Sequence, residues 1–202
     1  GGIFPRASKA IKLTPEIQAL TGIQSKAVSP TELITALLKT KSELLWFGGI
    51  GTYVKATHEQ HWEVGDKTND GLRINANEVG AQVIGEGANL GFTQEARIEF
   101  CKHGGRANAD FVDNSAGVDS SDHEVNIKIL LRPLVRGGDM ARDARDELLE
   151  SMTDNVADNV LKHNYEQTLA LTLAERTAVA DLDAHERFMS RLEEQRLLDR
   201  EV

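Results

Sequence analysis

The chain has 202 residues and a formal net charge of −9, with 27% charged and 40% hydrophobic residues. This length allows one or two domains with a sizeable core. The acidic balance argues against a nucleic-acid-binding protein, which needs clustered Lys and Arg, and no apolar run approaches the ~18 residues that span a bilayer. Cys101 is the single cysteine, which excludes an internal disulfide, so we expect a cytoplasmic protein without a membrane partner. Because the chain starts at Gly1, we interpret it as a piece of a longer protein.

Residues 1–28 show no regular pattern and are expected to be loop-like. A helix is predicted over residues 30–40, because Ser29 and Glu32 have the spacing of a capping box and Pro30 suits the first helical position. The apolar residues that follow repeat at helical spacing.

Three short apolar stretches read as strands: LLWF at 44–47, AQVI at 81–84 and ADFV at 109–112. Small residues follow each of them, in GGIGT, GEGANLG and NSAG. A helix from Thr93 to about His103 and another opened by Ser121 alternate with the strands. This order predicts a parallel α/β sheet, in which ligands bind at the carboxyl ends of the strands.

Charge density rises after residue 138, and glycine is absent from residue 139 onward. Apolar residues recur there at four-residue spacing, which predicts helices. We therefore expect an α/β fold over residues 1–138 followed by an α-helical C-terminal region over residues 139–202.

The stretch VIGEGANLGFTQEA resembles the strand, turn and helix that hold a nucleotide. Its glycines, Gly85, Gly87 and Gly91, are spaced one residue too widely for the G-x-G-x-x-G fingerprint, and a G-x-x-x-x-G-K-[ST] motif is absent from the sequence. These glycines therefore indicate a close approach of the backbone to another group, or positive φ, rather than a pyrophosphate cradle.

Four polar positions have two interpretations each. Asn89 and Asn114 could hydrogen-bond a carboxamide or a ribose, or could simply form turns. Ser121 could cap a helix, and the helix N-terminus that it caps would also suit a carboxylate. His123 could be a general base or a polar residue in the first turn of that helix. His58-Glu-Gln-His61 has H-x-x-H spacing without a convincing third ligand, so we expect no metal site.

Three segments carry a family resemblance: ELLWFGGIGTYVKA, GEGANLGFTQEARIEF and DNSAGVDSSDHEVNIKILL. Together they resemble the very large bacterial NAD-specific glutamate dehydrogenases. The resemblance implies NAD as cofactor and L-glutamate and 2-oxoglutarate as substrates, in a reversible oxidative deamination that releases ammonia. It also implies that residues 1–138 are the second half of a doubly wound, Rossmann-like NAD-binding domain, and that residues 139–202 belong to a helical C-terminal region.

The smaller glutamate, leucine and phenylalanine dehydrogenases share an EGAN turn and an NAGGV segment, which Glu86–Asn89 and Asn114–Val118 resemble. Ser115 and Ala116 depart from the second pattern. By this resemblance Ser121 lies near the side-chain carboxylate of the substrate. The implied cofactor-binding residues lie on the nicotinamide side of NAD and are Gly49, Ile50, Gly51, Thr52, Glu86, Gly87, Asn89 and Asn114.

The family's pyrophosphate loop and its catalytic lysine have no counterpart in these 202 residues, so no catalytic residue is assigned. The resemblance therefore implies an inactive fragment of an enzyme that assembles as a homo-oligomer through the full-length chain. The competing hypothesis is a non-catalytic regulatory or assembly module, whose acidic helical tail docks onto other subunits.

Overall fold

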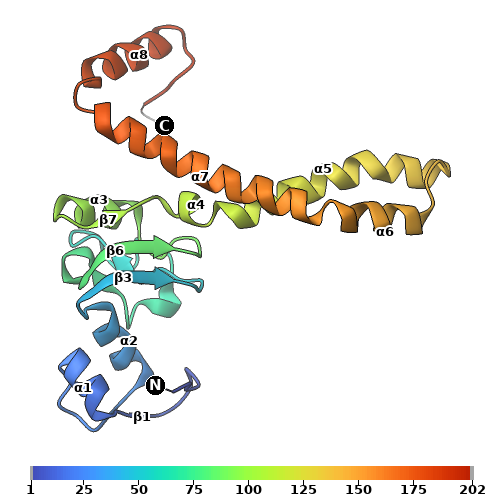
Figure 1. The fold of residues 1–202 in the computed structure, drawn as a ribbon. Helices are drawn as coiled ribbons and strands as arrows, with labels where there is room; N and C mark the ends of the chain where they lie inside the picture. Colours follow the sequence, from blue (N-terminus) through green and yellow to red (C-terminus); the bar gives the residue numbers. More distant parts are fainter. Residues whose placement is uncertain (1, 201–202) are drawn as a thin grey trace. The chain divides into compact units, whose positions relative to one another are not determined.

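Two of the apolar stretches form the central strands of a parallel sheet in the computed structural model. Strand β3 (Ser42–Phe47) pairs with β6 (Ala81–Glu86), and β6 pairs in turn with the short strand β7 (Arg106–Ala107). All the pairings in this sheet are parallel, which confirms the α/β class. The arrows of β3 and β6 run side by side in Figure 1.

The structure describes residues 2–200, and the chain divides into two units, residues 1–115 and 116–202. Within the described residues, no helix is both long enough and apolar enough to cross a membrane.

The helices of the first unit follow local capping signals. Ser29 and Glu32 form the expected capping box at the start of a helix, and Thr93 accepts a hydrogen bond from the amide of Ala96 at the start of another. The sequence missed the helix that Thr14 caps, so the prediction that residues 1–28 form only loop was wrong. The helices are α1 (Pro15–Thr21), α2 (Pro30–Leu38), α3 (Gln94–Lys102) and α4 (Asp110–Asp113), and two-residue strands form the pairs β1 (Ile11–Lys12) with β2 (Ala27–Val28) and β4 (Val54–Lys55) with β5 (Ile74–Asn75).

The prediction of a strand over residues 109–112 was wrong, because that segment forms α4. The chain turns back at Gly104, where φ is +92°, and pairs with β6 immediately afterwards, at Arg106–Ala107. The carboxylate of Asp113 then accepts from the amide of Glu86, the last residue of β6, and the carboxylate of Asp110 accepts from the amide of Leu90 in the turn that follows. These contacts favour a short helix where the apolar pattern suggested a strand.

One face of the sheet supports the core of the first unit. Phe47 and Ile84 are buried on that face, and Phe92 packs against Phe47 and Phe100 with ring centroids 5.7 and 5.8 Å apart. On the opposite face, the side chains that alternate with these residues are exposed: Leu44, Trp46 and Val83. Parallel sheets are normally covered on both faces, and in the first unit these three side chains leave the second face partly exposed.

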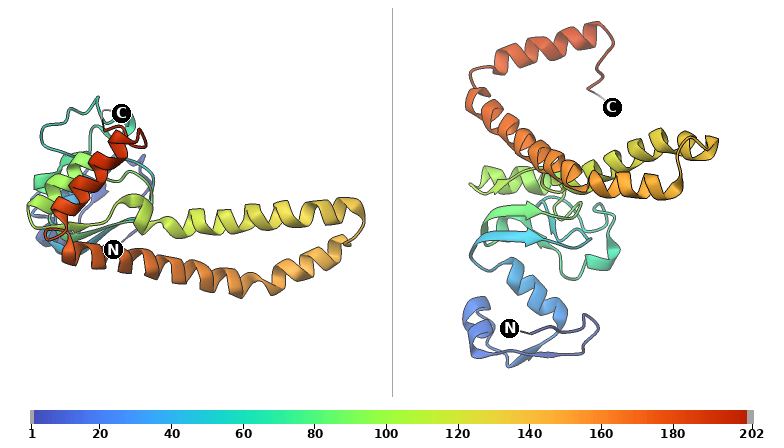
Figure 2. Two further views of the ribbon diagram at one scale, coloured as in Figure 1. Left: turned by 90° about the horizontal axis from the view of Figure 1, so that it is seen from above. Right: turned by 45° about the vertical axis from the view of Figure 1, so that its right-hand side comes forward.

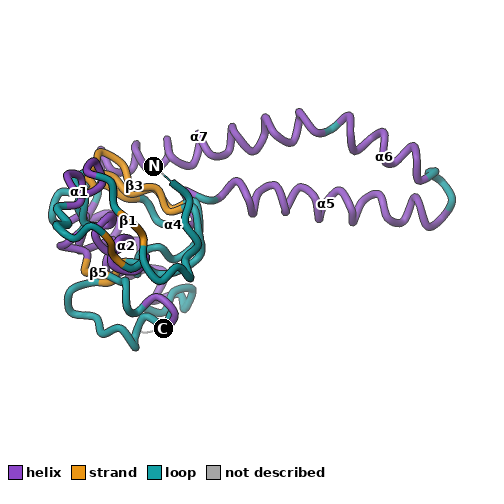
Figure 3. The backbone as a smooth tube through the Cα atoms, turned by 90° about the horizontal axis from the view of Figure 1, so that it is seen from below, coloured by secondary structure: helices purple, strands orange, loops and turns teal. Residues whose placement is uncertain are grey.

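The second unit is helical, as expected for the C-terminal region. It contains most of α5 (Ser115–Gly137), followed by α6 (Arg142–Ser151), α7 (Thr153–Thr177) and α8 (Leu182–Glu194). Figures 2 and 3 show α5 running beside α6 and α7 as one long hairpin. The prediction that Ser121 opens a helix was wrong, because α5 already begins at Ser115.

Candidate functional site

The register of the sheet places two of the predicted loops side by side. Phe47, the last residue of β3, pairs with Glu86, the last residue of β6, so residues 48–52 and 87–91 leave the same edge of the sheet. The amide of Tyr53 then donates to the carbonyl of Gly91 over 2.9 Å. The structure thus joins these loops at the carboxyl ends of the strands, where parallel sheets bind ligands.

The two asparagines that the sequence singled out are in contact. Asn114 Nδ2 donates to Asn89 Oδ1 over 2.6 Å, although 25 positions separate them in sequence. Asn114 ends α4 rather than following a strand, and Asn89 lies in the turn after β6. A carboxamide has two N–H donors and an acceptor, so this one bond leaves polar atoms of both side chains available to a ligand.

The glycines after β6 leave room for a tryptophan. A Cβ atom at Gly85 or at Gly87 would lie 2.4 or 2.5 Å from the ring of Trp46, which is closer than real Cβ atoms approach. Trp46 is itself 57% exposed. The bare backbone that the sequence pattern indicated is therefore explained within the chain by an indole lying across the end of β6.

Glu86 fixes the turn from the inside. Its carboxylate is fully buried, accepts from Arg97 Nε over 2.6 Å and from the amide of Phe92 over 2.9 Å. Arg97 also forms an ion pair with Asp110 over 3.3 Å, and Asp110 accepts from the amide of Leu90 over 2.8 Å. The side chain of Glu86 points into the protein, so Glu86 contributes to the candidate site by fixing the backbone of the turn.

Leu90 adopts a strained backbone conformation at the tip of the same turn. Its φ is +61°, in the left-handed region that residues other than glycine rarely occupy. Strain of this kind persists where surrounding contacts impose it, and it clusters at binding sites. Here the Asp110 carboxylate holds the Leu90 amide, and Asp113 accepts from the amide of Glu86 over 3.0 Å.

The loop after β3 is anchored at one end and exposed in the middle. Ile50 is 91% exposed, whereas Thr52 is buried and its amide donates to Asp66 Oδ2 over 2.9 Å. Gly51 has a φ of +133°, and a Cβ there would lie 2.5 Å from Asn69 Nδ2, so glycine is required at this position. The loop therefore presents backbone and one apolar side chain outward from a fixed base.

Asp66 supplies much of that base. The side chain of Asn69 donates to its carboxylate over 2.5 Å, and this bond, followed by the one from the Thr52 amide, lowers the pKa of Asp66 below its ordinary value. Arg73 adds a further favourable charge interaction and also donates from Nε to the Thr52 carbonyl over 2.8 Å. Asp66 thus stays ionised and holds the loop at neutral pH.

Ser121 has a local role that the sequence did not anticipate. Its hydroxyl donates to the carbonyl of Gly117 over 3.1 Å, one turn earlier in α5. Ser121 and His123 both lie inside the helix, so neither stands in its first turn. They belong to the second unit, whereas the loops after β3 and β6 belong to the first.

Sequence reasoning missed the residues that position the loops. Trp46, Asp66, Arg97 and Asp110 act through contacts between separate segments, which a linear pattern does not reveal. The sequence feature that could have indicated this network is Arg97, a cation within the first turns of a helix that packs on the core.

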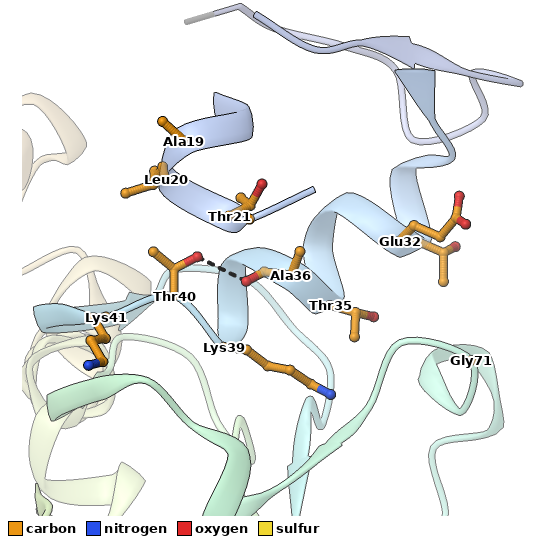
Figure 4. A pocket seen from close by; sticks show the side chains of 12 residues that line it. Ala19, Leu20, Thr21, Glu32, Thr35, Ala36, Lys39, Thr40, Lys41 and Gly71 are labelled. Atoms are coloured by element: carbon orange, nitrogen blue, oxygen red, sulfur yellow. Dashed lines mark hydrogen bonds between the residues drawn. The ribbon is translucent and has the colours of Figure 1, made fainter. Parts of the chain in front are cut away.

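A hollow of about 890 Å³ lies elsewhere in the first unit, against α1 and α2 (Figure 4). Its lining includes Thr21, Thr35 and Lys39, and it reaches Lys41 immediately before β3 begins. It therefore lies toward the amino end of β3, away from the loops. None of the residues that the sequence indicated as cofactor-binding lines it.

Comparisons with known proteins bear on the whole chain. The family model described as bacterial NAD-glutamate dehydrogenase, catalytic domain, matches residues 1–174. The NAD-specific glutamate dehydrogenase of Pseudomonas aeruginosa is 56% identical to the chain over 99% of the chain's length. The NAD-specific glutamate dehydrogenases of Halomonas elongata and Mycobacterium tuberculosis are 50% and 46% identical, each over 100% of the chain's length. The chain spans only 12%, 12% and 13% of the lengths of these relatives.

The buried ion pair gives the first prediction. Replacing Arg97 by Ala leaves the Glu86 carboxylate buried without its cation, which costs about 3–5 kcal/mol of unfolding free energy. The matched control is Lys39→Ala, which removes the cation of a solvent-exposed ion pair with Glu78. The Lys39 side chain is 41% exposed and the Glu78 side chain 35% exposed. That change should cost about 0–1 kcal/mol. Urea unfolding measures both, and equal losses in the two variants would contradict the assignment.

The lowered pKa of Asp66 gives a prediction about acid. Because folding lowers this pKa from its ordinary value of 3.8, the carboxylate stabilises the fold above that pH, and the contribution is lost as the pH falls through the folded value. Unfolding free energies of the native chain and of Asp66→Asn, measured from about pH 6 to about pH 3, should converge toward acid. Parallel curves over this range would show that Asp66 does not provide the stabilisation.

Proposed function

Because the chain belongs to the bacterial NAD-glutamate dehydrogenase catalytic-domain family, we propose that it is part of an enzyme that interconverts L-glutamate with 2-oxoglutarate and ammonia. In this proposal NAD is the cofactor, and residues 1–138 belong to its binding domain. The chain contributes the loops on the nicotinamide side. The contact between Asn89 and Asn114 carries the proposal, because it joins the two segments that resemble the cofactor loops of smaller dehydrogenases.

The chemistry of these residues suits the nicotinamide half of NAD. Carboxamide side chains provide both donors and acceptors, which match an amide and the hydroxyls of a ribose. Asn89 is exposed and Asn114 half-buried, so a ligand at the strand edge has access to them. When bound, NAD accepts hydride from the amino acid, and the protein supplies position and electrostatics.

The loop after β3 offers the second wall of the proposed site. Gly49 is exposed and Gly51 half-buried, Ile50 offers an exposed apolar side chain, and the buried Thr52 anchors the end of the loop through its amide. Because the loop is anchored at one end before a ligand binds, it loses less conformational entropy on binding. These residues would exclude water from one side of the nicotinamide ring.

Glu86 and Gly87 take different roles in this proposal. The Glu86 side chain is a positioning group, since its carboxylate is committed to Arg97 and to the Phe92 amide. Gly87 lets the turn lie under the Trp46 ring. Both would shape the cofactor site through the backbone of residues 86–91.

Ser121 is proposed to lie near the side-chain carboxylate of glutamate, on the resemblance described above. Its hydroxyl donates to the Gly117 carbonyl within α5, so it would have to rotate out of this bond to donate to a carboxylate. We also propose that the full-length protein forms a homo-oligomer and that the 202 residues alone do not turn over glutamate. An assembly module is the less favoured alternative, because the matched family model is a catalytic domain.

The proposal predicts coupled effects in the full-length enzyme. Asn89→Ala and Asn114→Ala should each raise the dissociation constant for NAD about 2- to 10-fold, because each removes one or two neutral hydrogen bonds. Since the two side chains bond each other, the double variant should lose less than the sum of the single losses. Isothermal titration with NAD measures these constants.

Asn126→Ala is the matched control for this series. Asn126 donates only within its own helix, to the carbonyl of Asp122 over 2.8 Å. NAD affinity should not change in this variant. If it is also unchanged in Asn89→Ala and Asn114→Ala, the proposed place of NAD is wrong.

A further inference from the structure

The second unit contains a cluster of metal-ligating side chains contributed by two helices. Asp119 and His123 lie one turn apart on α5, and His163 projects from α7. His163 Nδ1 lies 2.8 Å from Asp119 Oδ2, and His123 Nε2 lies 3.7 Å from Asp119 Oδ1. One ligand atom from each side chain falls within 4.8 Å of the other two.

The arrangement of the rings favours a shared ligand. The two imidazoles are nearly parallel, with an interplanar angle of 7° and centroids 6.1 Å apart, and the carboxylate lies beside both. Neutral imidazole and carboxylate are donors to divalent transition metals.

We propose that Asp119, His123 and His163 form a binding site for a divalent transition metal, of which Zn²⁺ fits best. Two His nitrogens and one carboxylate oxygen are a ligand set that zinc uses when a fourth position stays open to water. The ligands must close around the ion, because Zn–N and Zn–O distances are about 2.0–2.2 Å. Side-chain exposures of 21% for Asp119, 29% for His123 and 45% for His163 give an ion an entry path and the side chains room to adjust.

The ion would join two helices that are distant in sequence. Residues 119 and 163 are 44 positions apart, and their hydrogen bond already ties α5 to α7. An ion that binds the folded pair, and binds the separated helices weakly, stabilises the pairing. Ser121 is about 200° around the helix from Asp119, so the metal site faces away from the residue proposed to lie near substrate.

The sequence pattern alone did not reveal this cluster, because its third member comes from another helix. The H-x-x-H pair at His58 and His61 has the more suggestive spacing, but neither residue belongs to the cluster found among the described residues. Spacing identifies metal ligands on one helix, whereas this site depends on how two helices pack.

Cobalt spectroscopy on the purified, untagged chain tests the proposal. Co²⁺ should bind with a stoichiometry of one, with visible absorption typical of low coordination number, and Zn²⁺ should displace it. Mg²⁺ and Ca²⁺ should not, because they prefer oxygen ligands. His163→Ala and Asp119→Asn should each weaken Co²⁺ binding at least about 10-fold, since even outer-shell changes cost 10- to 100-fold.

His185→Ala is the control, because His185 lies on α8 and outside the cluster. It should leave Co²⁺ binding unchanged, and far-ultraviolet circular dichroism should show that all variants keep their helices. Absence of the cobalt spectrum from the native chain would overturn the proposal and leave the cluster as a hydrogen-bonded contact between α5 and α7. A spectrum that persists in helical His163→Ala and Asp119→Asn would overturn it equally.

Discussion

The buried pair of Glu86 and Arg97 is the interaction on which the first unit depends. It joins the carboxyl end of the central strand β6 to helix α3, and through Asp110 it reaches α4. A carboxylate and a guanidinium lose much hydration when they are buried, so they are stable there only with further hydrogen bonds. The Phe92 amide and the Asp110 carboxylate provide these contacts, and they hold the turn after Asn89 through the amides of Phe92 and Leu90. Asp113 holds the start of the turn by accepting from the amide of Glu86.

The same network explains how a loop can be both exposed and ordered. The outer side of the turn carries Asn89 and Leu90, and the inner side is held by buried charges. Asp66 does the same for the loop that carries Ile50, through the Thr52 amide. In the proposed site, these two neighbouring loops with anchored bases would hold a planar cofactor ring without ordering new backbone.

The sequence predicted elements whose signals are local and missed those that depend on distant contacts. The helix caps at Ser29 and Thr93 and the two apolar central strands are local, and the structure confirms them. Residues 109–112 failed because Asp110 and Asp113 bond to another segment, which outweighs the strand-like composition.

The candidate site shows the same division. The positions of the loops after β3 and β6 followed from the strand pattern, whereas Asn114 was expected after a strand and instead ends α4. The glycines correctly indicated a close approach. That the approaching group is Trp46 could not be read from the sequence, because it depends on the pairing of β3 with β6. The contacts of Arg97, Asp66 and His163 are likewise properties of packing rather than of spacing.

Hydrogen exchange of the full-length enzyme with and without NAD tests most directly whether these loops hold the cofactor. The account predicts slower exchange on NAD binding in peptides that cover residues 48–52 and 86–91, with no change in peptides that cover α1 and the hollow beside it. Unchanged exchange in both loops, together with protection at the hollow, would contradict the account and place the cofactor at the other end of the sheet.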